Sequence, residues 1–439
     1  MNVSDSRRLA AELERLGYLP AQQAEDADVI VLNTCVVRQQ PEDRAVNRLL
    51  SLRPLKKKRP AVVIGLMGCL VGVKNPAATL SARFPFVDVL MPPSDPQPLL
   101  NLLLERDGRT VAAAQRTEQD AWQDGTLPLP VGERGQLVAT YLPVVLGCSH
   151  ACAYCVIPHR RGPERSRPSS DIIAEAETLA SQGVKEITLL GQIVDRYGLD
   201  RVDERINLAG LLQRLHPIAG IERIRFLTSH PNWLTGELLQ AVAELPKVCE
   251  HIEVPIQSGD DEILQAMRRG YTVRQYRELI ALIRRTIPGV SIHSDIIVGF
   301  PGETDAHFQR TVDLLAELRL DKVHIARYSP RPGTLAARTM TDEIPADEKE
   351  RRRRALDDLQ ARIVGEINQQ FLGHSVEVLV EEKQRHRWRG RTRGNKLVFF
   401  EDDRDLLGQL VPVHIQWAGP WSMVGVAADR VTGPPLIPR

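Results

Sequence analysis

Three cysteines stand within eight residues near the middle of this 439-residue chain. Cys148, Cys152 and Cys155 follow a short apolar run, with three and then two residues between them. In a loop, these spacings can turn three thiolates toward one point, which suits three corners of an iron-sulfur cube and leaves the fourth iron without a protein ligand. Such an iron is open to a small molecule. The alternative is a zinc site completed by His150 or His159, although structural zinc favours paired Cys-x2-Cys knuckles and four protein ligands.

Two further cysteines each follow a predicted strand in the first hundred residues. Cys35 comes after the strand pattern 28–33, and Cys69 after the apolar run that begins at residue 61. The carboxyl ends of neighbouring parallel strands lie on one edge of a sheet, so we expect these two thiols to meet. The alternative is two independent small core residues, a common fate of free cysteines. Cys249 has no cysteine near it in the sequence, and we expect it to be a packed thiol.

The composition is that of an ordinary globular protein, with 43% hydrophobic and 26% charged residues, which excludes a disordered, collagen-like or coiled-coil chain. The 57 basic and 56 acidic residues give a formal net charge of +1, so overall charge selects no class of partner. Six cysteines are too few for a secreted disulfide scaffold. The longest apolar run, 61–73, is short of the roughly 20 residues that span a bilayer, and charges from Asp5 onward leave no signal peptide. We therefore expect a cytoplasmic protein without a membrane segment.

The elements that must position the cysteines alternate between helix and strand. In residues 1–106 the patterns predict an α/β layer domain with parallel strands, its helices at 5–16, 41–52 and 98–106 and its strands at 28–33, 61–65 and 87–91. Residues 107–138 are rich in Gln, Gly, Asp, Pro and Thr without an apolar period, and we predict a linker.

A second strand-helix series predicts a core domain over residues 139–371. Its candidate strands are 141–146, 186–190, 224–228, 251–256, 291–298 and 322–328. Six such repeats indicate a parallel sheet, open or curled into a partial (β/α)6 barrel, whose chemistry lies in the loops at the carboxyl ends of the strands. A long charged helix at about 345–371 follows. Short alternating strands separated by glycine turns then predict a small all-β module over 372–439.

Seven basic residues and no acid occupy the stretch 383–396. Alternate arginines on a strand project to one face, and a tryptophan among them offers a stacking surface, so we predict contacts with RNA. The alternative is a solvated charged edge. The predicted RNA-binding residues are Lys383, Arg385, Arg387, Trp388, Arg389, Arg391, Arg393 and Lys396. The other basic run, 351–354, follows Glu348 and Glu350 and is predicted to be a salt-bridged solvent face of the long helix.

Ten short runs occur in a fixed order along the chain. They are MNVSDS (1–6), VLNTCVVR (31–38), MGC (67–69), GCSHACAYCVIPHRRGPERSR (147–167), LLGQ (189–192), FLTSHP (226–231), VPIQSG (254–259), MRRGYT (267–272), DIIVGFPGET (295–304) and YSPRPGT (328–334). Together they resemble the MiaB-type tRNA methylthiotransferases of the radical S-adenosylmethionine superfamily, over essentially the full length. The resemblance implies an N-terminal cluster domain, a radical core and a C-terminal TRAM module that binds RNA.

The resemblance also implies two 4Fe-4S clusters and S-adenosylmethionine. The three-cysteine loop would bind the radical cluster, whose open iron chelates S-adenosylmethionine and splits it into methionine and a 5′-deoxyadenosyl radical. Cys35 and Cys69 would bind an auxiliary cluster used in sulfur insertion. Relatives carry a third auxiliary ligand in a Gly-Cys-Gln-Met-Asn run, and this chain starts at the Met-Asn of that run. We therefore expect the true start codon to lie upstream of Met1.

Residues that contact S-adenosylmethionine are expected at the carboxyl ends of the core strands. Gly299, Gly302 and Glu303 lie where the resemblance implies a close approach of backbone to cofactor; the alternative is an ordinary strand-to-helix turn. Four more candidates at or just past predicted strand ends have a purely structural role as their alternative: Gln192, Pro255, Gln257 and Ser258. No catalytic residue is assigned beyond the cluster ligands.

By resemblance, the activity is sulfur insertion and methylation at carbon 2 of N6-isopentenyladenosine beside the tRNA anticodon, giving 2-methylthio-N6-isopentenyladenosine. No side-chain acid or base removes such a hydrogen at neutral pH, so the cofactor supplies the reactivity. The expected partners are the tRNA anticodon stem-loop, an electron donor such as flavodoxin or ferredoxin, and a sulfur donor. The alternatives are methylthiolation of threonylcarbamoyladenosine in tRNA or of a ribosomal-protein aspartate, and a non-enzymatic zinc and RNA-binding protein.

Overall fold

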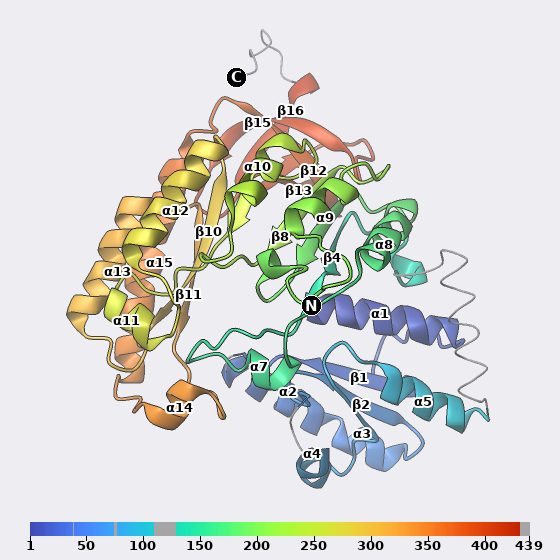
Figure 1. Ribbon diagram of the computed structural model, residues 1–439. Helices are drawn as coiled ribbons and strands as arrows, with labels where there is room; N and C mark the ends of the chain where they lie inside the picture. Colours follow the sequence, from blue (N-terminus) through green and yellow to red (C-terminus); the bar gives the residue numbers. More distant parts are fainter. Residues whose placement is uncertain (38, 74–76, 109–128, 431–439) are drawn as a thin grey trace. The chain divides into compact units, whose positions relative to one another are not determined.

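The computed structural model describes residues 1–37, 39–73, 77–108 and 129–430 (Figure 1). The chain divides into two compact units, and each unit is made of several segments that are separate in the sequence. The first unit comprises Met1–Arg134, Tyr141–Gln182 and Ser329–Thr339, and the second comprises Gly135–Thr140, Gly183–Tyr328 and Met340–Arg439. The domain boundaries expected at residues 106, 138 and 371 therefore stay predictions.

The first unit is built on a parallel three-stranded sheet. Its order is β1-β2-β3, with β1 at Val29–Thr34, β2 at Val63–Gly68 and β3 at Val89–Met91. Val29 lies opposite Val63, and Gly65 opposite Val89. The predicted parallel α/β layer is confirmed, and β2 extends three residues beyond its predicted end. The helices of this layer are α1 (Asn2–Arg15), α2 (Gln39–Ser51), α3 (Arg53–Lys58), α4 (Ala77–Arg83) and α5 (Gln97–Arg106).

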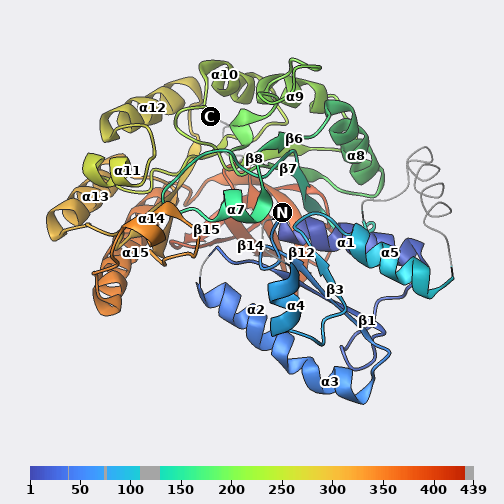
Figure 2. The same ribbon diagram turned by 60° about the horizontal axis from the view of Figure 1, so that its bottom comes forward.

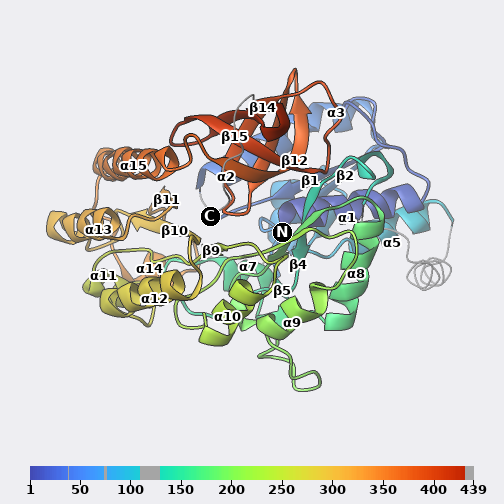
Figure 3. The same cartoon turned by 90° about the horizontal axis from the view of Figure 1, so that it is seen from above.

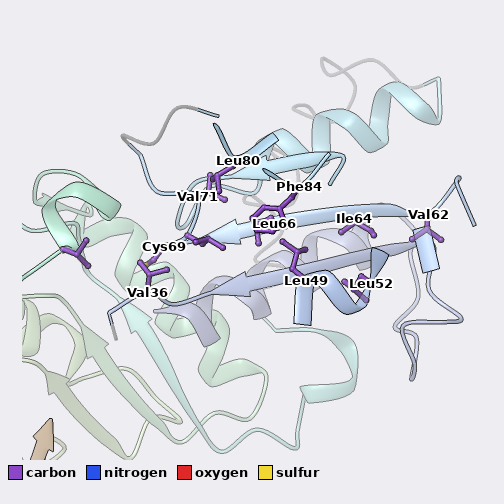
Figure 4. Close-up of a cluster of buried hydrophobic side chains, with 12 residues drawn as sticks. Val36, Leu49, Leu52, Val62, Ile64, Leu66, Cys69, Val71, Leu80 and Phe84 are labelled. Atoms are coloured by element: carbon purple, nitrogen blue, oxygen red, sulfur yellow. The ribbon is translucent and has the colours of Figure 1, made fainter. Parts of the chain in front are cut away.

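Successive residues of β2 bury opposite faces of this sheet. Val63 and Met67 pack against Leu9 of α1 and the leucines of α5. Ile64 and Leu66 point the other way, into a cluster with side chains of α2 and α4 (Figure 4). All six residues of β2 are buried, as expected for a central strand covered on both faces.

The first unit also holds the segment that follows the linker. Strands β5 (Val145–Leu146) and β6 (Arg165–Ser166) pair in antiparallel fashion, and helix α7 (Ile157–Arg161) lies between them in the chain. Helices α8 (Ser169–Ser181) and α14 (Leu335–Thr339) complete the unit, with a 3-10 turn at Val131–Glu133. The β5-β6 pair therefore closes the base of the loop that carries the three cysteines.

The second unit contains two three-stranded sheets in the orders β4-β7-β8 and β11-β10-β9. Their strands are β4 (Ala139–Pro143), which begins in this unit, β7 (Glu186–Leu190), β8 (Arg223–Leu227), β9 (His251–Glu253), β10 (Ser291–Val298) and β11 (Lys322–Arg327). Strand pairs β7-β8, β9-β10 and β10-β11 are parallel, and a parallel bridge joins Ile224 to Val248. This continuity fits the predicted partial barrel.

Helices cover the outer side of the second unit's strands (Figure 2). They are α9 (Leu208–Leu215), α10 (Gly236–Glu244), α11 (Asp261–Ala266), α12 (Val273–Thr286), α13 (Asp305–Leu318) and α15 (Ala346–Gln369), with a 3-10 turn at Val194–Arg196. Helix α15 is the long charged helix expected at 345–371. Within the described residues, no helix is both long and apolar enough to cross a membrane.

The last five strands form a closed barrel in the order β12-β13-β14-β16-β15 (Figure 3). They are β12 (Ser375–Gln384), β13 (Arg387–Thr392), β14 (Leu397–Glu401), β15 (Leu410–Ala418) and β16 (Met423–Ala427), followed by a 3-10 turn at Ala428–Arg430. The barrel has its own core, which includes Val378, Phe400 and Ile415. This confirms the predicted small all-β module.

Candidate functional site

The loop with three cysteines is held at its base by backbone contacts. Gly147 has a positive φ of 70°, and a Cβ there would lie 2.0 Å from the Pro163 carbonyl oxygen, so only glycine fits. The Cys148 amide donates to the Gly162 carbonyl at 3.1 Å, and the Cys155 amide donates to the Cys152 carbonyl at the same distance. The loop therefore leaves β5 and returns to β6 along a fixed path.

The thiols of this loop suit an iron-sulfur cluster by their chemistry. All six cysteines of the chain are described, and none is in a disulfide. Cys148 is buried, Cys152 and Cys155 are half-buried, and the Cys152 Sγ lies 3.3 Å from the His150 Nδ1. Among the described residues, no three His, Cys, Asp or Glu side chains are grouped closely enough to hold a metal ion. By residue type and spacing the three thiols suit three corners of a cube, but their side chains are not gathered around one point in this structure.

Cys35 and Cys69 lie at one edge of the first sheet, as expected. The last residue pair between β1 and β2 is Thr34 with Gly68. Cys35 directly follows Thr34 in the sequence, and Cys69 directly follows Gly68. The Cys69 amide donates to the Thr34 carbonyl at 3.0 Å. Cys35 is half-buried and Cys69 is buried at the end of the cluster that includes Leu66 (Figure 4). The expected placement at a common edge is thus observed, and their role as ligands of one cluster stays a prediction.

An arginine that sequence reasoning missed lies beside Cys69. Arg161 ends α7, and its side chain is only 5% exposed. Its Nη2 donates to the Asn2 Oδ1 at 2.7 Å and lies 3.7 Å from the Asp5 carboxylate. Burial raises the pKa of the Cys69 thiol, and the Arg161 guanidinium, which hydrogen-bonds that thiol, opposes this shift. The signal in the sequence was a pair of arginines directly after the three-cysteine loop.

The other half of that pair and a third arginine lie in the same unit. Arg160 is half-buried, and burial lowers the pKa of its guanidinium, with Glu42 opposing this shift and Arg331 adding to it. Arg331 is 3% exposed, donates from Nη1 to the Gln39 Oε1 at 2.8 Å and forms an ion pair with Glu42. Three arginines from two separate segments therefore lie in the unit that holds Cys69, two of them buried beside the carboxylates of Asp5 and Glu42, and only the fold assembles them.

The segment after β9 runs along the end of β10. The Gln257 amide donates to the Asp295 carbonyl at 2.9 Å, and the Gln257 carbonyl accepts from the Ile297 amide at 3.0 Å. Gln257 has a positive φ of 78° and is buried, as is Ser258. The Pro255 carbonyl accepts from the Tyr271 hydroxyl at 3.1 Å. These candidates therefore share one buried turn at the carboxyl end of the strands.

Gln192 lies in the turn between β7 and the 3-10 turn that begins at Val194. Its side chain is half-buried. The turn is held by the Gly191 amide, which donates to the Leu227 carbonyl at 2.9 Å, so Gln192 also follows the carboxyl end of a core strand.

Glu303 turns into the protein and binds protein groups. It is 3% exposed, and its Oε2 accepts from the Gly299 amide at 2.6 Å and from Arg352 at 2.8 Å. Burial raises its pKa against these two interactions. Thr304 then caps α13. These contacts are those of the strand-to-helix turn that was the alternative for this loop, and Gly299 and Gly302 both need their positive φ values of 70° and 83°.

The basic stretch lies on β12, β13 and the loop after them, and its side chains alternate as expected. Arg387, Arg389 and Arg391 are exposed or half-buried, whereas the residues between them are buried. Trp388 is 4% exposed, packs in the barrel core and donates from Nε1 to the Asp402 carbonyl at 3.1 Å. The prediction that Trp388 offers a stacking surface is therefore wrong, because β13 alternates and the tryptophan falls on its inner face.

Acids from other strands neutralise much of this stretch. Arg387 pairs with Glu401, and both Arg389 and Arg391 pair with Glu381. Further along, Arg393 binds the Glu250 carboxylate at 2.7 Å and Lys396 binds Asp321 at 2.9 Å, both in the core part of the same unit. Lys383 and Arg385, at the exposed hairpin between β12 and β13, have no salt bridge among the described residues.

Three protein-family models match the chain. The Radical SAM superfamily matches residues 142–315, Uncharacterized protein family UPF0004 matches residues 1–92, and the TRAM domain matches residues 369–427. The first range contains the three-cysteine loop, the second contains Cys35 and Cys69, and the third contains the β-barrel. The radical SAM family implies a 4Fe-4S cluster and S-adenosylmethionine.

One solved structure with a comparable fold is the radical S-adenosylmethionine methyltransferase TsrM from Kitasatospora setae. It aligns with a TM-score of 0.50 at 16% identity, over 68% of this chain and 61% of that chain. At this identity the likeness concerns the fold alone.

Sequence relatives extend along nearly the whole chain. The tRNA-2-methylthio-N(6)-dimethylallyladenosine synthase of Herpetosiphon aurantiacus is 47% identical over 97% of this chain and 94% of its own length. Proteins of the same name from a Roseiflexus species and from Chloroflexus aurantiacus are 47% and 46% identical over 98% and 97% of this chain, and 87% and 89% of their own lengths. With its radical SAM loop, second cysteine pair and TRAM barrel, the chain belongs to the tRNA-2-methylthio-N(6)-dimethylallyladenosine synthase family.

Proposed function

We propose that this chain converts N6-isopentenyladenosine in tRNA, beside the anticodon, to 2-methylthio-N6-isopentenyladenosine. The observation that supports this most is the three-cysteine loop in a chain with full-length relatives. Those relatives are 46–47% identical over 97–98% of this chain and are named as synthases of the 2-methylthio nucleoside. The reaction replaces the hydrogen on carbon 2 with a methylthio group. The sulfur comes from a donor, and a second S-adenosylmethionine is the expected source of the methyl group.

Cys148, Cys152 and Cys155 would hold the radical cluster. When bound, this cluster with S-adenosylmethionine supplies the carbon radical that removes a hydrogen which no side-chain base can take at neutral pH. The chain's own part is to bind and orient. The buried turn with Pro255, Gln257 and Ser258 offers backbone and side-chain groups for the cofactor, as do Gln192, Gly299 and Gly302; the Glu303 carboxylate, which binds Arg352, fixes the loop.

Cys35 and Cys69 would bind an auxiliary 4Fe-4S cluster. Their support is the shared sheet edge and the position of Cys69 next to the buried Arg161. A cation there favours negatively charged thiolates and sulfide in a buried place.

RNA contact is proposed for the exposed hairpin of the barrel, at Lys383, Arg385 and Arg387. The half-buried arginines at 389 and 391 would add to it only by exchanging their acidic partners for phosphate. Arg393 and Lys396 are better explained as anchors of the barrel to the core. We further propose a flavodoxin or ferredoxin as electron donor, a cytoplasmic location, and the domain plan 1–106, 107–138, 139–371 and 372–439.

The test is nucleoside mass spectrometry of tRNA from a host that lacks this modification and expresses the chain. We expect 2-methylthio-N6-isopentenyladenosine with the intact chain and only N6-isopentenyladenosine with Cys152→Ala, because two thiols do not hold the radical cluster. Cys249→Ala is the matched control, since it removes a buried thiol that belongs to the second unit and not to this loop, and should retain the product.

Other products would redirect the assignment. Methylthiolated threonylcarbamoyladenosine, or a methylthiolated ribosomal-protein aspartate, with unchanged N6-isopentenyladenosine would contradict the proposed substrate. A colourless protein with zinc and no iron after anaerobic purification would contradict the radical chemistry altogether.

A further inference from the structure

The TRAM-like barrel has almost no net charge with which to attract RNA. Residues 372–427 contain eight basic and seven acidic residues, a formal charge of +1. Most of these cations have acidic partners, such as Arg389 with Glu381 and Arg404 with Asp402. Binding by phosphate contacts alone gains its free energy from unpaired cations and released counterions, and the barrel offers few of them. RNA bound here needs another source of affinity.

Two tryptophans of the barrel are open to solvent. Trp417 is 53% exposed and Trp421 is 60% exposed, the highest exposures among the described large apolar side chains of the barrel. Trp417 lies near the end of β15 and Trp421 in the turn between β15 and β16, in which the Gly419 amide donates to the Ser422 carbonyl at 2.9 Å. The whole chain has only five tryptophans, and leaving two of them in water forfeits the burial that this side chain usually provides.

The turn that carries them is fixed. The Asn368 Nδ2 donates to the Gly419 carbonyl and the Gln369 Nε2 donates to the Ala418 carbonyl, both at 2.8 Å, so the last turn of α15 holds the β15-β16 connection. A Cβ on Gly419 would lie 2.4 Å from an atom of the Trp417 six-membered ring. The indole therefore rests against the glycine backbone, in a place that any larger residue would fill.

We infer that Trp417 and Trp421 form a stacking platform for unpaired bases of the RNA substrate. Aromatic rings stack on bases of any sequence and need no net charge, which matches a neutral barrel with exposed indoles. The inference rests on the proposed function, because it takes the tRNA substrate as given. In this inference Trp417 and Trp421 take the stacking role that the sequence analysis gave to Trp388, which is buried.

The test measures binding of the full-length chain to a fluorescein-labelled anticodon stem-loop RNA by fluorescence anisotropy. We expect Trp417→Ala and Trp421→Ala each to weaken binding roughly tenfold, and Trp417→Phe to retain most of the affinity. Leu410→Ala, which truncates another exposed apolar residue of the same strand, should leave the Kd unchanged. Gly419→Ala should weaken binding although both indoles remain, because its methyl group displaces the Trp417 ring.

The salt dependence separates stacking from phosphate contacts. The alanine variants should keep the slope of log Kd against log salt concentration of the intact chain, whereas Lys383→Ala should reduce it. Unchanged Kd values in both tryptophan variants would overturn the inference, as would a change in oligomeric state without a change in RNA affinity, which would indicate a protein partner for this surface. In either case a 2-methylthio product in the tRNA assay would leave the proposed function standing, while its absence from the intact chain would remove that function independently.

Discussion

Burial divides the six cysteines into groups of different reactivity. Cys249 is 1% exposed and lies near Arg225 and Glu186, and burial raises the pKa of its thiol to about 11. Cys35, Cys152 and Cys155 are half-buried. Thiolates are the reactive and metal-binding form of cysteine, so at neutral pH the Cys249 thiol, with no second cysteine near it in the sequence, reacts slowly. This agrees with the expectation that Cys249 is a packed thiol.

The inertness of Cys249 is measurable by differential alkylation. In the metal-free, reduced chain at pH 8, we expect iodoacetamide to label Cys249 on the order of a hundredfold more slowly than a thiol with the ordinary pKa of about 8.5, because only about a thousandth of Cys249 is thiolate. Labelling should accelerate as the pH rises toward 11. Peptide mass spectrometry against the half-buried thiols as internal reference gives the rates, and equal rates at pH 8 would contradict the burial seen here.

At the scale of one element, helix periodicity sorts the charged run on α15. Arg351, Arg353 and Arg354 form ion pairs on the outer side of the helix, with Glu348, Glu350 and Asp357 among their partners. Arg352 is only 4% exposed and binds the buried Glu303. The predicted salt-bridged solvent face is thus correct for three residues and wrong for Arg352, since a run of four residues spans more than one side of a helix.

Replacing the buried member of the run should cost far more stability than replacing an exposed one. Arg352→Met leaves the Glu303 carboxyl buried without its cation, which we expect to lower the free energy of unfolding by about 3 kcal/mol. Arg354→Gln, whose side chain is 71% exposed, is the control and should change it little. Urea unfolding followed by circular dichroism gives both values. Equal effects would show that the Arg352–Glu303 pair contributes no more than a surface pair.

At the scale of the whole molecule, reciprocal hydrogen bonds from arginine side chains join the barrel to the core strands of the second unit. Arg223 donates from Nη1 to the Arg391 carbonyl at 2.6 Å, and Arg225 donates from Nη2 to the Thr392 carbonyl at 2.8 Å. In return, Arg393 donates to the Val248 carbonyl at 2.7 Å. Core side chains bind barrel backbone and a barrel side chain binds core backbone, so neither part keeps these groups satisfied without the other.

We therefore expect the barrel and the core strands to unfold together. In native-state hydrogen exchange, peptides from β12–β16 and from β8–β9 should lose protection at the same denaturant concentration. Arg225→Ala should let the barrel peptides exchange first, because it removes the bond to Thr392 and leaves the buried Glu186 without its cation. Arg387→Gln, which changes an exposed pair within the barrel, should keep the transitions coincident. Separate transitions in the intact chain would contradict this coupling.

Much of the fold and of the chemistry could be predicted from local sequence signals. Strands β7 and β10 have the predicted bounds, because an apolar run of five to eight residues between turn signals has few other solutions. The three-cysteine loop could be found because its three thiols lie within eight consecutive residues. The placement of Cys35 and Cys69 at one sheet edge followed from topology alone, since parallel strands have their carboxyl ends on the same edge.

The sequence by itself determined the types of residue, their spacing and the period of each element. Only the tertiary structure decided which partners those residues meet. Arg161 reaches Cys69, and acids on other strands neutralise the arginines of β13, through contacts between segments far apart in the chain. Trp388 went inside and Trp417 outside because barrel closure assigns each face of a strand to core or solvent. The physical reason is that burial and charge pairing depend on the surroundings of a side chain in space, which no window along the chain contains.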